Sequence, residues 1–125
     1  MALFDKTIDT LSTSLDLLMV RHQVTTDNIA NAETPGFKAR RVEFESELQK
    51  AVEAADATSG SSDIGDVIPT IFEDPRSELG QDLNSVDMDR EMADLTKNDI
   101  KYSAATQVIN KKFSLLRYAI SEGDR

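Results

Sequence analysis

Apolar side chains near the N-terminus recur at alternating steps of three and four residues. This spacing places them on one face of an α-helix, with a period close to the 3.5-residue repeat of a coiled-coil seam. Leu17, Val20 and Val24 widen the apolar face beyond a single seam. We therefore predict a long helix over about residues 2–31. Its seam register contains Phe4, Ile8, Leu11, Leu15, Leu18 and Ile29, with His22 and Thr25 in between.

A second segment near the C-terminus shows the same four-three spacing over a longer distance. Asp87 is a suitable N-cap, and Asp89 and Glu91 lie in the first turn, where the helix dipole favours anions. Gly123 is a residue type that commonly ends helices. These features predict a helix over residues 87–122. Its register contains Met88, Met92, Leu95, Asp99, Tyr102, Thr106, Ile109, Phe113, Leu116 and Ile120.

Two polar residues, Asp99 and Thr106, interrupt this second register. Polar residues in a seam can fix the alignment of paired helices at a cost in stability. The other interpretation is that the register is assigned to the wrong face.

A forced turn follows the first helix. Pro35 cannot donate a backbone hydrogen bond and disfavours helical backbone at Thr34. Pro35 followed by Gly36 fits the two central positions of a type II turn, with positive φ at the glycine. Residues 28–31, which precede this turn, fit either an ordinary helix end or an interface element.

The middle of the chain is less regular. Alternation at residues 42–45 indicates an extended segment, and residues 45–55 fit a short helix. Residues 56–66 have the composition of a flexible linker. Residues 67–72 form a small apolar island broken by a proline, which we expect to dock as an extended segment.

These elements predict an all-α protein whose two long terminal helices pair as an antiparallel coiled coil around an irregular, partly flexible acidic middle. The helical segments 1–31 and 87–122 would form one domain, and residues 32–86 the intervening part. Two helices alone cannot bury apolar stripes this wide, so we expect polymerisation to complete the packing.

The net charge of −9 comes from one part of the chain. Residues 43–82 carry 11 acidic and 2 basic side chains, whereas the two terminal segments are each neutral. Neutral helices can pack against copies of themselves without mutual repulsion. The acidic middle argues against nucleic-acid binding, which needs basic residues for the phosphates.

The residues that carry enzyme chemistry are scarce. The chain has no cysteine and one histidine, and the sequence shows no nucleophile–base pair or phosphate-binding glycine loop. His22 fits a partly buried structural histidine better than a ligand. The acidic residues near 87–91 lack the spacing of a calcium loop and fit dipole complementation. We expect no enzyme activity, no cofactor, no metal and no small-molecule substrate.

The sequence shows no apolar run ahead of a small-residue cleavage site at its start and no stretch able to span a bilayer. Taken alone, these features favour a cytoplasmic protein.

Two blocks of residues resemble the rod, hook and hook-associated axial proteins of the bacterial flagellum. The first is Asn28-Ile29-Ala30-Asn31-Ala32-Glu33-Thr34-Pro35-Gly36-Phe37-Lys38-Ala39-Arg40, followed by Val42-Glu43-Phe44. The second is Asn84-Ser85-Val86-Asp87-Met88-Asp89-Arg90-Glu91-Met92, followed by Asn98, Tyr102, Lys112-Phe113 and Leu116-Arg117. The short length and the Lys38-Ala39-Arg40 continuation favour the proximal rod branch of this family.

The resemblance implies a structural subunit whose terminal helices pair and pack into the wall of a tube. This rod would join the inner-membrane ring to the hook and transmit torque. Subunits of the family are exported unfolded by the flagellar type III system without a cleaved signal, which implies a periplasmic location. The implied partners are other copies of the chain, the other rod subunits, the rod–ring junction protein, the inner-membrane ring and the export gate.

The expected assembly motif is Asn28, Ile29, Ala30, Asn31, Thr34, Pro35, Gly36 and Phe37. The expected helix–helix contacts join Phe4, Ile8, Leu11, Leu15 and Leu18 to the second register, within or between subunits. Two residues depart from the family pattern. Leu83 stands where glycine is frequent, which puts a turn with positive φ in question, and Phe37 stands where tyrosine is common.

Two other functions are compatible with these patterns. The first is a soluble helical adaptor or secretion chaperone of a type III export system, which would be stably helical in dilute solution. The second is a peripheral membrane protein anchored by the first helix, which the neutral charge of that helix disfavours.

Overall fold

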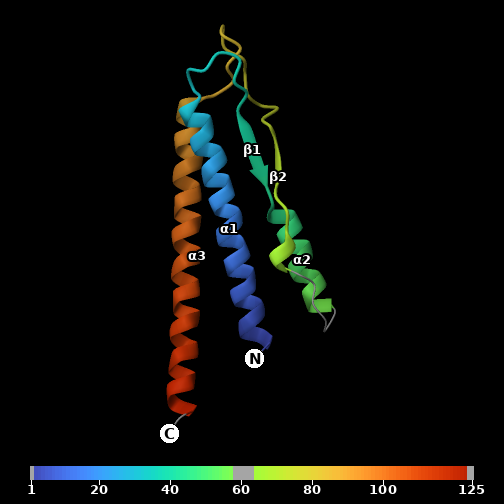
Figure 1. Cartoon of the computed structure of the whole chain (residues 1–125), viewed down its shortest axis with the longest axis vertical. Coiled ribbons are helices and arrows are strands. Elements are labelled where there is room, and N and C mark those ends of the chain that lie inside the picture. Colours follow the sequence, from blue (N-terminus) through green and yellow to red (C-terminus); the bar gives the residue numbers. More distant parts are fainter. Residues whose placement is uncertain (1, 58–63, 124–125) are drawn as a thin grey trace.

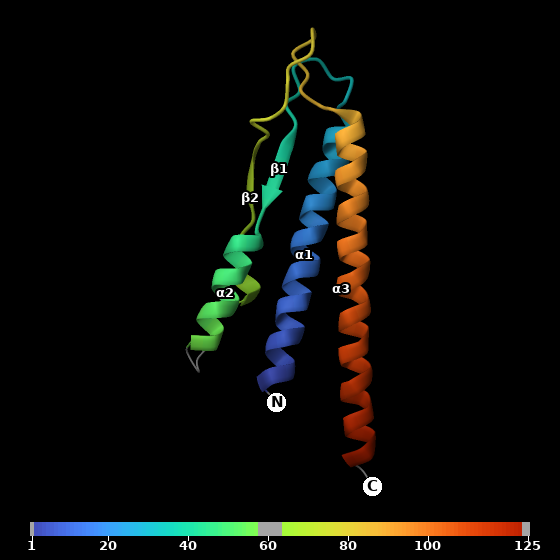
Figure 2. The same ribbon diagram turned by 180° about the vertical axis from the view of Figure 1, so that it is seen from behind.

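The computed structural model describes the backbone of residues 2–57 and 64–123, and the side chains from residue 6 onward in those ranges. Two long helices dominate the molecule: α1 spans Ala2–Ala30 and α3 spans Met88–Gly123. They lie side by side and run in opposite directions (Figure 1, Figure 2). Both predicted helices are confirmed to within one residue at each end. Their packing as a coiled coil stays a prediction.

The fold is mainly α, in line with the expected helical class, and a small antiparallel sheet accompanies the helices. Strand β1, Arg40–Glu43, pairs with β2, Thr70–Glu73, and Val42 lies opposite Ile71. Extended segments at both places were expected, but their pairing was not. β-Branched and aromatic residues favour these segments as strands, and each strand supplies hydrogen-bond partners for the other's backbone.

A third helix, α2, spans Glu45–Ala57 and begins directly after β1. The predicted short helix is confirmed, with two further residues at its end. In both views α1 lies between α3 and α2 (Figure 1, Figure 2). The expected linker overlaps the end of α2 and the short 3₁₀ helix η1, Ile64–Asp66. Its residues 58–63 lie outside the described part of the chain.

The apolar core lies where α1, β1 and α2 meet. It contains Leu17 and Leu18 of α1 together with Val42 and Phe44, and Tyr102 of α3 packs against it. The core is therefore on the side of α1 that faces the sheet as well as on the side that faces α3. This arrangement explains why the apolar face of α1 is wider than one seam.

The buried face of α3 differs from the predicted register. Glu91 and Asn98 are buried on this helix, whereas the apolar Met92 and the predicted seam residue Asp99 are exposed. Asn98 Nδ2 donates a hydrogen bond of 2.9 Å to the Leu18 carbonyl of α1. At Met92 and Asp99 the predicted register is thus one residue out, because the polar residues Glu91 and Asn98, with partners on α1, take the inner positions.

The residues predicted to form helix–helix contacts differ in their burial. Leu18 is buried, and Ile8, Leu11, Leu15, Leu95, Tyr102, Ile109 and Leu116 are half-buried. Four of the predicted positions are exposed within the subunit and cannot belong to an interface inside it: Met88, Met92, Phe113 and Ile120. The side chain of Phe4 lies outside the described residues.

The turn after α1 has the predicted form. The Phe37 amide donates to the Thr34 carbonyl at 3.2 Å, and Gly36 has a φ of +76°. A second turn closes with a 3.0 Å bond from the Leu83 amide to the Gly80 carbonyl. Leu83 has a φ of +62°, so the positive-φ turn is present although glycine is absent.

Candidate functional site

Asn28 connects three elements from the last turn of α1. Its side chain is fully buried. Its Nδ2 donates to the Arg40 carbonyl at 2.8 Å and to Glu91 Oε2 at 3.1 Å, and its Oδ1 accepts from the Arg40 amide at 3.0 Å. One amide side chain therefore satisfies both backbone groups of the first residue of β1 and also contacts α3.

Arg41 is the centre of a buried charge cluster next to Asn28. Its two terminal nitrogens lie 2.7 and 2.9 Å from the two carboxylate oxygens of Glu91. Its Nε donates to Asp74 Oδ2 at 2.7 Å, and Arg90 lies 3.2 Å from the same oxygen. This two-pronged pairing is the strong geometry for guanidinium and carboxylate groups. It links β1 to α3 and to the segment after β2.

The cluster is electrostatically balanced. Burial alone would raise the pKa of Asp74, but hydrogen bonds from the Arg76 amide and from Arg41 outweigh it and hold that pKa below its usual range. Burial likewise lowers the pKa of Arg41, and the hydrogen bonds and charges of Glu91 and Asp74 raise it above its ordinary value. Buried charges are tolerated because each has a partner.

A second junction ties the turn after α1 to the segment before α3. Asn84 Nδ2 donates to the carbonyls of Asn31 at 2.8 Å and Thr34 at 2.7 Å. The Ser85 hydroxyl accepts from the Ala39 amide at 2.8 Å. Asn84 and Ser85 are both buried. The two junctions together hold the ends of α1 and α3 in a fixed relation.

Some residues of the predicted assembly motif are buried in the fold, and others are exposed on its surface. Asn28 is used within the subunit, and Ile29, Asn31 and Phe37 are half-buried. The exposed members are Ala30, Thr34, Pro35 and Gly36. The turn itself is thus the part of the motif that a neighbouring molecule can reach.

Sequence reasoning missed several residues of these junctions. Arg41 and Asp74 were not assigned any role from the sequence. Glu91 was assigned to dipole complementation, and Asn84 and Ser85 were noted only in the resemblance. The sequence did contain one signal: Arg41 is a basic residue beside the apolar Val42 in a predicted extended segment. Such a residue indicates a buried ion pair only when its acidic partner is known.

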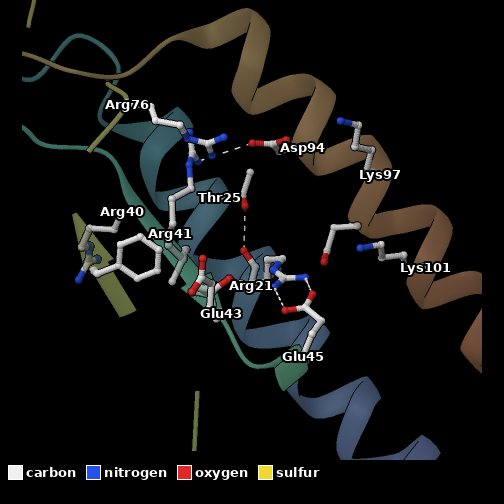
Figure 3. Close-up of a pocket in the computed structure, with 14 residues that line it drawn as sticks. Arg21, Thr25, Arg40, Arg41, Glu43, Glu45, Arg76, Asp94, Lys97 and Lys101 are labelled. Carbon is white, nitrogen blue, oxygen red and sulfur yellow. Dashed lines mark hydrogen bonds and ion pairs between the residues drawn. The ribbon is translucent and has the colours of Figure 1, made fainter. Parts of the chain in front are cut away.

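A cleft of about 330 Å³ opens between α1, the two strands and α3 (Figure 3). Arg21 and Glu45 point toward each other at its edge, with contacts of 2.6 and 2.9 Å. This pairing lowers the pKa of Glu45 to about 2, against the opposing effect of burial. Lys97 and Lys101 reach the cleft from α3. The arginine–carboxylate pairs in this cleft serve to join elements.

Three further observations concern metal binding, membrane crossing and the single histidine. Across residues 6–57 and 64–123, no three His, Cys, Asp or Glu side chains gather in a way that could hold a metal ion. No helix in the described part of the chain carries an apolar stretch sufficient to cross a bilayer. His22 has its Nδ1 3.3 Å from Asp99, which gives this histidine a structural partner.

α3 exposes large apolar side chains along much of its length. Its exposed large apolar side chains are Met88, Met92, Ile100, Val108, Phe113, Leu115, Tyr118 and Ile120. Exposed apolar residues over most of a helix mark a surface for contact with another molecule.

Comparison with known proteins places this geometry in context. Residues 8–38 match the family described as flagella basal body rod protein. The flagellar basal body rod protein FlgB of Borrelia hermsii is 36% identical, over 96% of this chain and 99% of its own length. FlgB of Bacillus subtilis is 33% identical over 98% and 99%. FlgB of Escherichia coli is 30% identical over 89% and 90%.

Proposed function

This chain belongs to the flagellar basal body rod protein family, and from that premise we propose that it is a proximal rod subunit. In this role it connects the inner-membrane ring to the distal rod and transmits torque. The related rod proteins are structural components, and their near full-length similarity supports a non-enzymatic role at the level of the family.

The observation that carries the proposal is the uncovered apolar surface of α3. Glu91 and Asn98 fasten the N-terminal half of α3 to α1, whereas Phe113 and Ile120, which lie further along the same side of the helix, are exposed. The subunit therefore has an apolar surface free for neighbours. Self-assembly through the terminal helices would bury that surface.

The exposed turn supplies a second proposed contact. Pro35 and Gly36 lie at the end of the helix pair and are held there by the Asn84 junction. We assign this turn to contacts with neighbouring subunits along the rod. Pre-organised contacts lose less conformational entropy on binding than mobile ones.

The proposed location is the periplasmic rod, reached through the flagellar type III export gate without a cleaved signal. The proposed partners are the other rod subunits, the rod–ring junction protein and the inner-membrane ring. As a domain assignment, we propose that segments 1–31 and 87–122 fold as one unit, with residues 32–86 attached to it.

Deletion of the gene tests this function. Purified basal bodies from the deletion strain should show inner rings without a rod, and the cells should not swim. Reintroduction of the intact gene should restore both. Intact rods and normal swimming in the deletion strain would refute the rod assignment and favour an export adaptor.

A further inference from the structure

An apolar groove of about 650 Å³ lies between α1, α2 and α3. Leu18 of α1 forms part of its floor. α2 and α3 form its walls, and the apolar wall residues include Leu48 and Val52 of α2 and Ala104 and Ala105 of α3. The two alanines leave room beside α3, so a helix can approach closely. A groove bounded by three helices is a usual receptor for the apolar face of a fourth.

The C-terminal part of α3 has the complementary property. Phe113, Leu115, Tyr118 and Ile120 are each at least half exposed. α3 has 36 residues and α1 has 29, and α3 extends past the N-terminal end of α1 (Figure 1). At about 100° per residue, Leu115 and Tyr118 share one side of this end of α3, and Phe113 and Ile120 share the other. The subunit covers neither side, and one side at a time can enter a groove.

The two features cannot meet within one molecule. Ala104 and Ala105 form one wall of the groove, and residues 113–120 continue the same unbroken helix. A continuous helix cannot fold back onto its own side. An occupant that carries this apolar end must therefore come from a second copy.

We propose that residues 113–120 of one copy dock into the groove between α1, α2 and α3 of a second copy. The inference rests on the proposed function as a self-assembling subunit, and it names the surfaces that join. Because the groove and the docking helix are different surfaces, the contact is heterologous and can continue from copy to copy.

Charge complementarity supports the same pairing. α2, which forms one wall, carries four carboxylates and one lysine. Glu45, Glu47 and Asp56 pair with Arg21, Lys50 and Lys6 of the same chain, and Glu53 is the groove carboxylate that remains for a partner's cation. Residues 108–123 of α3 carry three basic side chains and one carboxylate. Opposite charges on the two surfaces steer the approach and disfavour the pairing of like surfaces. The contact should therefore weaken at high salt.

Cysteine crosslinking tests the contact, since the natural chain contains no cysteine. The full-length variants Ala104→Cys, at the groove, and Tyr118→Cys, at the docking helix, are purified, mixed and oxidised. Because docking raises the local thiol concentration, the mixed crosslink should form at least about tenfold faster than with a control. The control pairs Ala104→Cys with Gln23→Cys, an exposed position on α1.

The charge assignment has its own variants. Arg117→Glu, added to the Tyr118→Cys chain, should lower the crosslinking rate severalfold. Glu53→Lys in the groove partner should restore part of it. A mixed rate no higher than that of the control would overturn the proposal. So would a crosslink that forms as readily between two Tyr118→Cys chains, since that result indicates contact between like surfaces.

A further experiment distinguishes a failure of the docking proposal from a failure of the rod assignment. A chain with both cysteines is used to complement the deletion strain, and isolated basal bodies are then oxidised. Swimming cells whose rods give no intermolecular crosslink would refute the docking and leave the rod assignment intact. A deletion strain that swims would refute the rod assignment, whatever crosslinks form in solution.

Discussion

Glu91 is fully buried on α3, with both carboxylate oxygens within 2.9 Å of Arg41 and one of them also within reach of Asn28. The carboxylate is thus a shared acceptor for two elements. At the level of single residues, such groups decide which faces of the helices are internal, because a buried charge without its partner is very costly.

Glu91→Gln removes this charge while it keeps the shape of the side chain. We expect a loss of about 3 kcal/mol in the free energy of unfolding, at the low end for a broken buried ion pair because Asp74 still binds Arg41. Urea denaturation measures the loss. Glu122→Gln, at the exposed end of the same helix, is the control and should change stability by no more than about 0.5 kcal/mol.

Leu83 occupies left-handed backbone with a φ of +62° and a largely exposed side chain. This conformation strains an L-residue by about 1–2 kcal/mol, part of which glycine recovers. We expect Leu83→Gly to stabilise the subunit by about 0.5–1 kcal/mol, measured as a higher urea midpoint. Leu79→Gly, at an exposed position without positive φ, should lower the midpoint. Equal decreases in both variants would contradict the strain.

At the level of elements, α3 shows why a hydrophobic pattern can locate a helix without orienting it. Positions such as Leu95, Tyr102 and Ile109 belong to the inner face as predicted. The remaining inner positions include Glu91 and Asn98, which a pattern of apolar residues assigns to solvent. Their partners lie on α1 and β1, far away in the sequence, so no local rule could identify them.

A buried position on α1 and an exposed position on α3 should respond differently to an introduced charge. Leu18→Asp places a carboxylate in the core and should unfold the subunit, at a cost of several kcal/mol. Phe113→Asp should leave the monomer helical, because this side chain is half exposed, and yet abolish motility. Circular dichroism and swimming assays measure the two effects. Gln107→Asp on an exposed position of α3 should leave both unchanged, and normal swimming in Phe113→Asp would refute the assembly face.

The Arg21–Glu45 ion pair, which joins α1 to α2, depends on pH. Pairing with Arg21 lowers the pKa of Glu45 to about 2, below its ordinary value of 4.5. The ion pair therefore contributes to the free energy of unfolding above pH 4.5, and this contribution is lost as the pH falls toward 2. The stability difference between the natural chain and Glu45→Gln should shrink over this range. In an Arg21→Leu background the difference should be smaller, because only the backbone hydrogen bonds to the carboxylate remain. An undiminished difference would contradict the pairing.

For the whole molecule, the internal hydrogen bonds and ion pairs are concentrated at one end, whereas exposed apolar residues run along the whole of α3. The charge cluster and the Asn84 junction lie at the end of the helix pair where the chain turns, and the exposed apolar residues reach the opposite end of α3 (Figure 1). Fastening at one end fixes the relative position of the helices. At the other end the apolar side chains of α3 are exposed.

The sequence alone determined the long helices, their ends, the Pro35-Gly36 turn and the short helix after residue 45. These features follow from period, caps and turn residues, which act over a few neighbouring positions. Only the tertiary structure decided the inner face of α3, the pairing of β1 with β2 and the left-handed conformation of Leu83. The first two depend on partners distant in the chain, whose hydrogen bonds and ion pairs outweigh the local preference of the residue. Leu83 is held in its conformation by the Gly80–Leu83 turn, which outweighs the preference of leucine for negative φ.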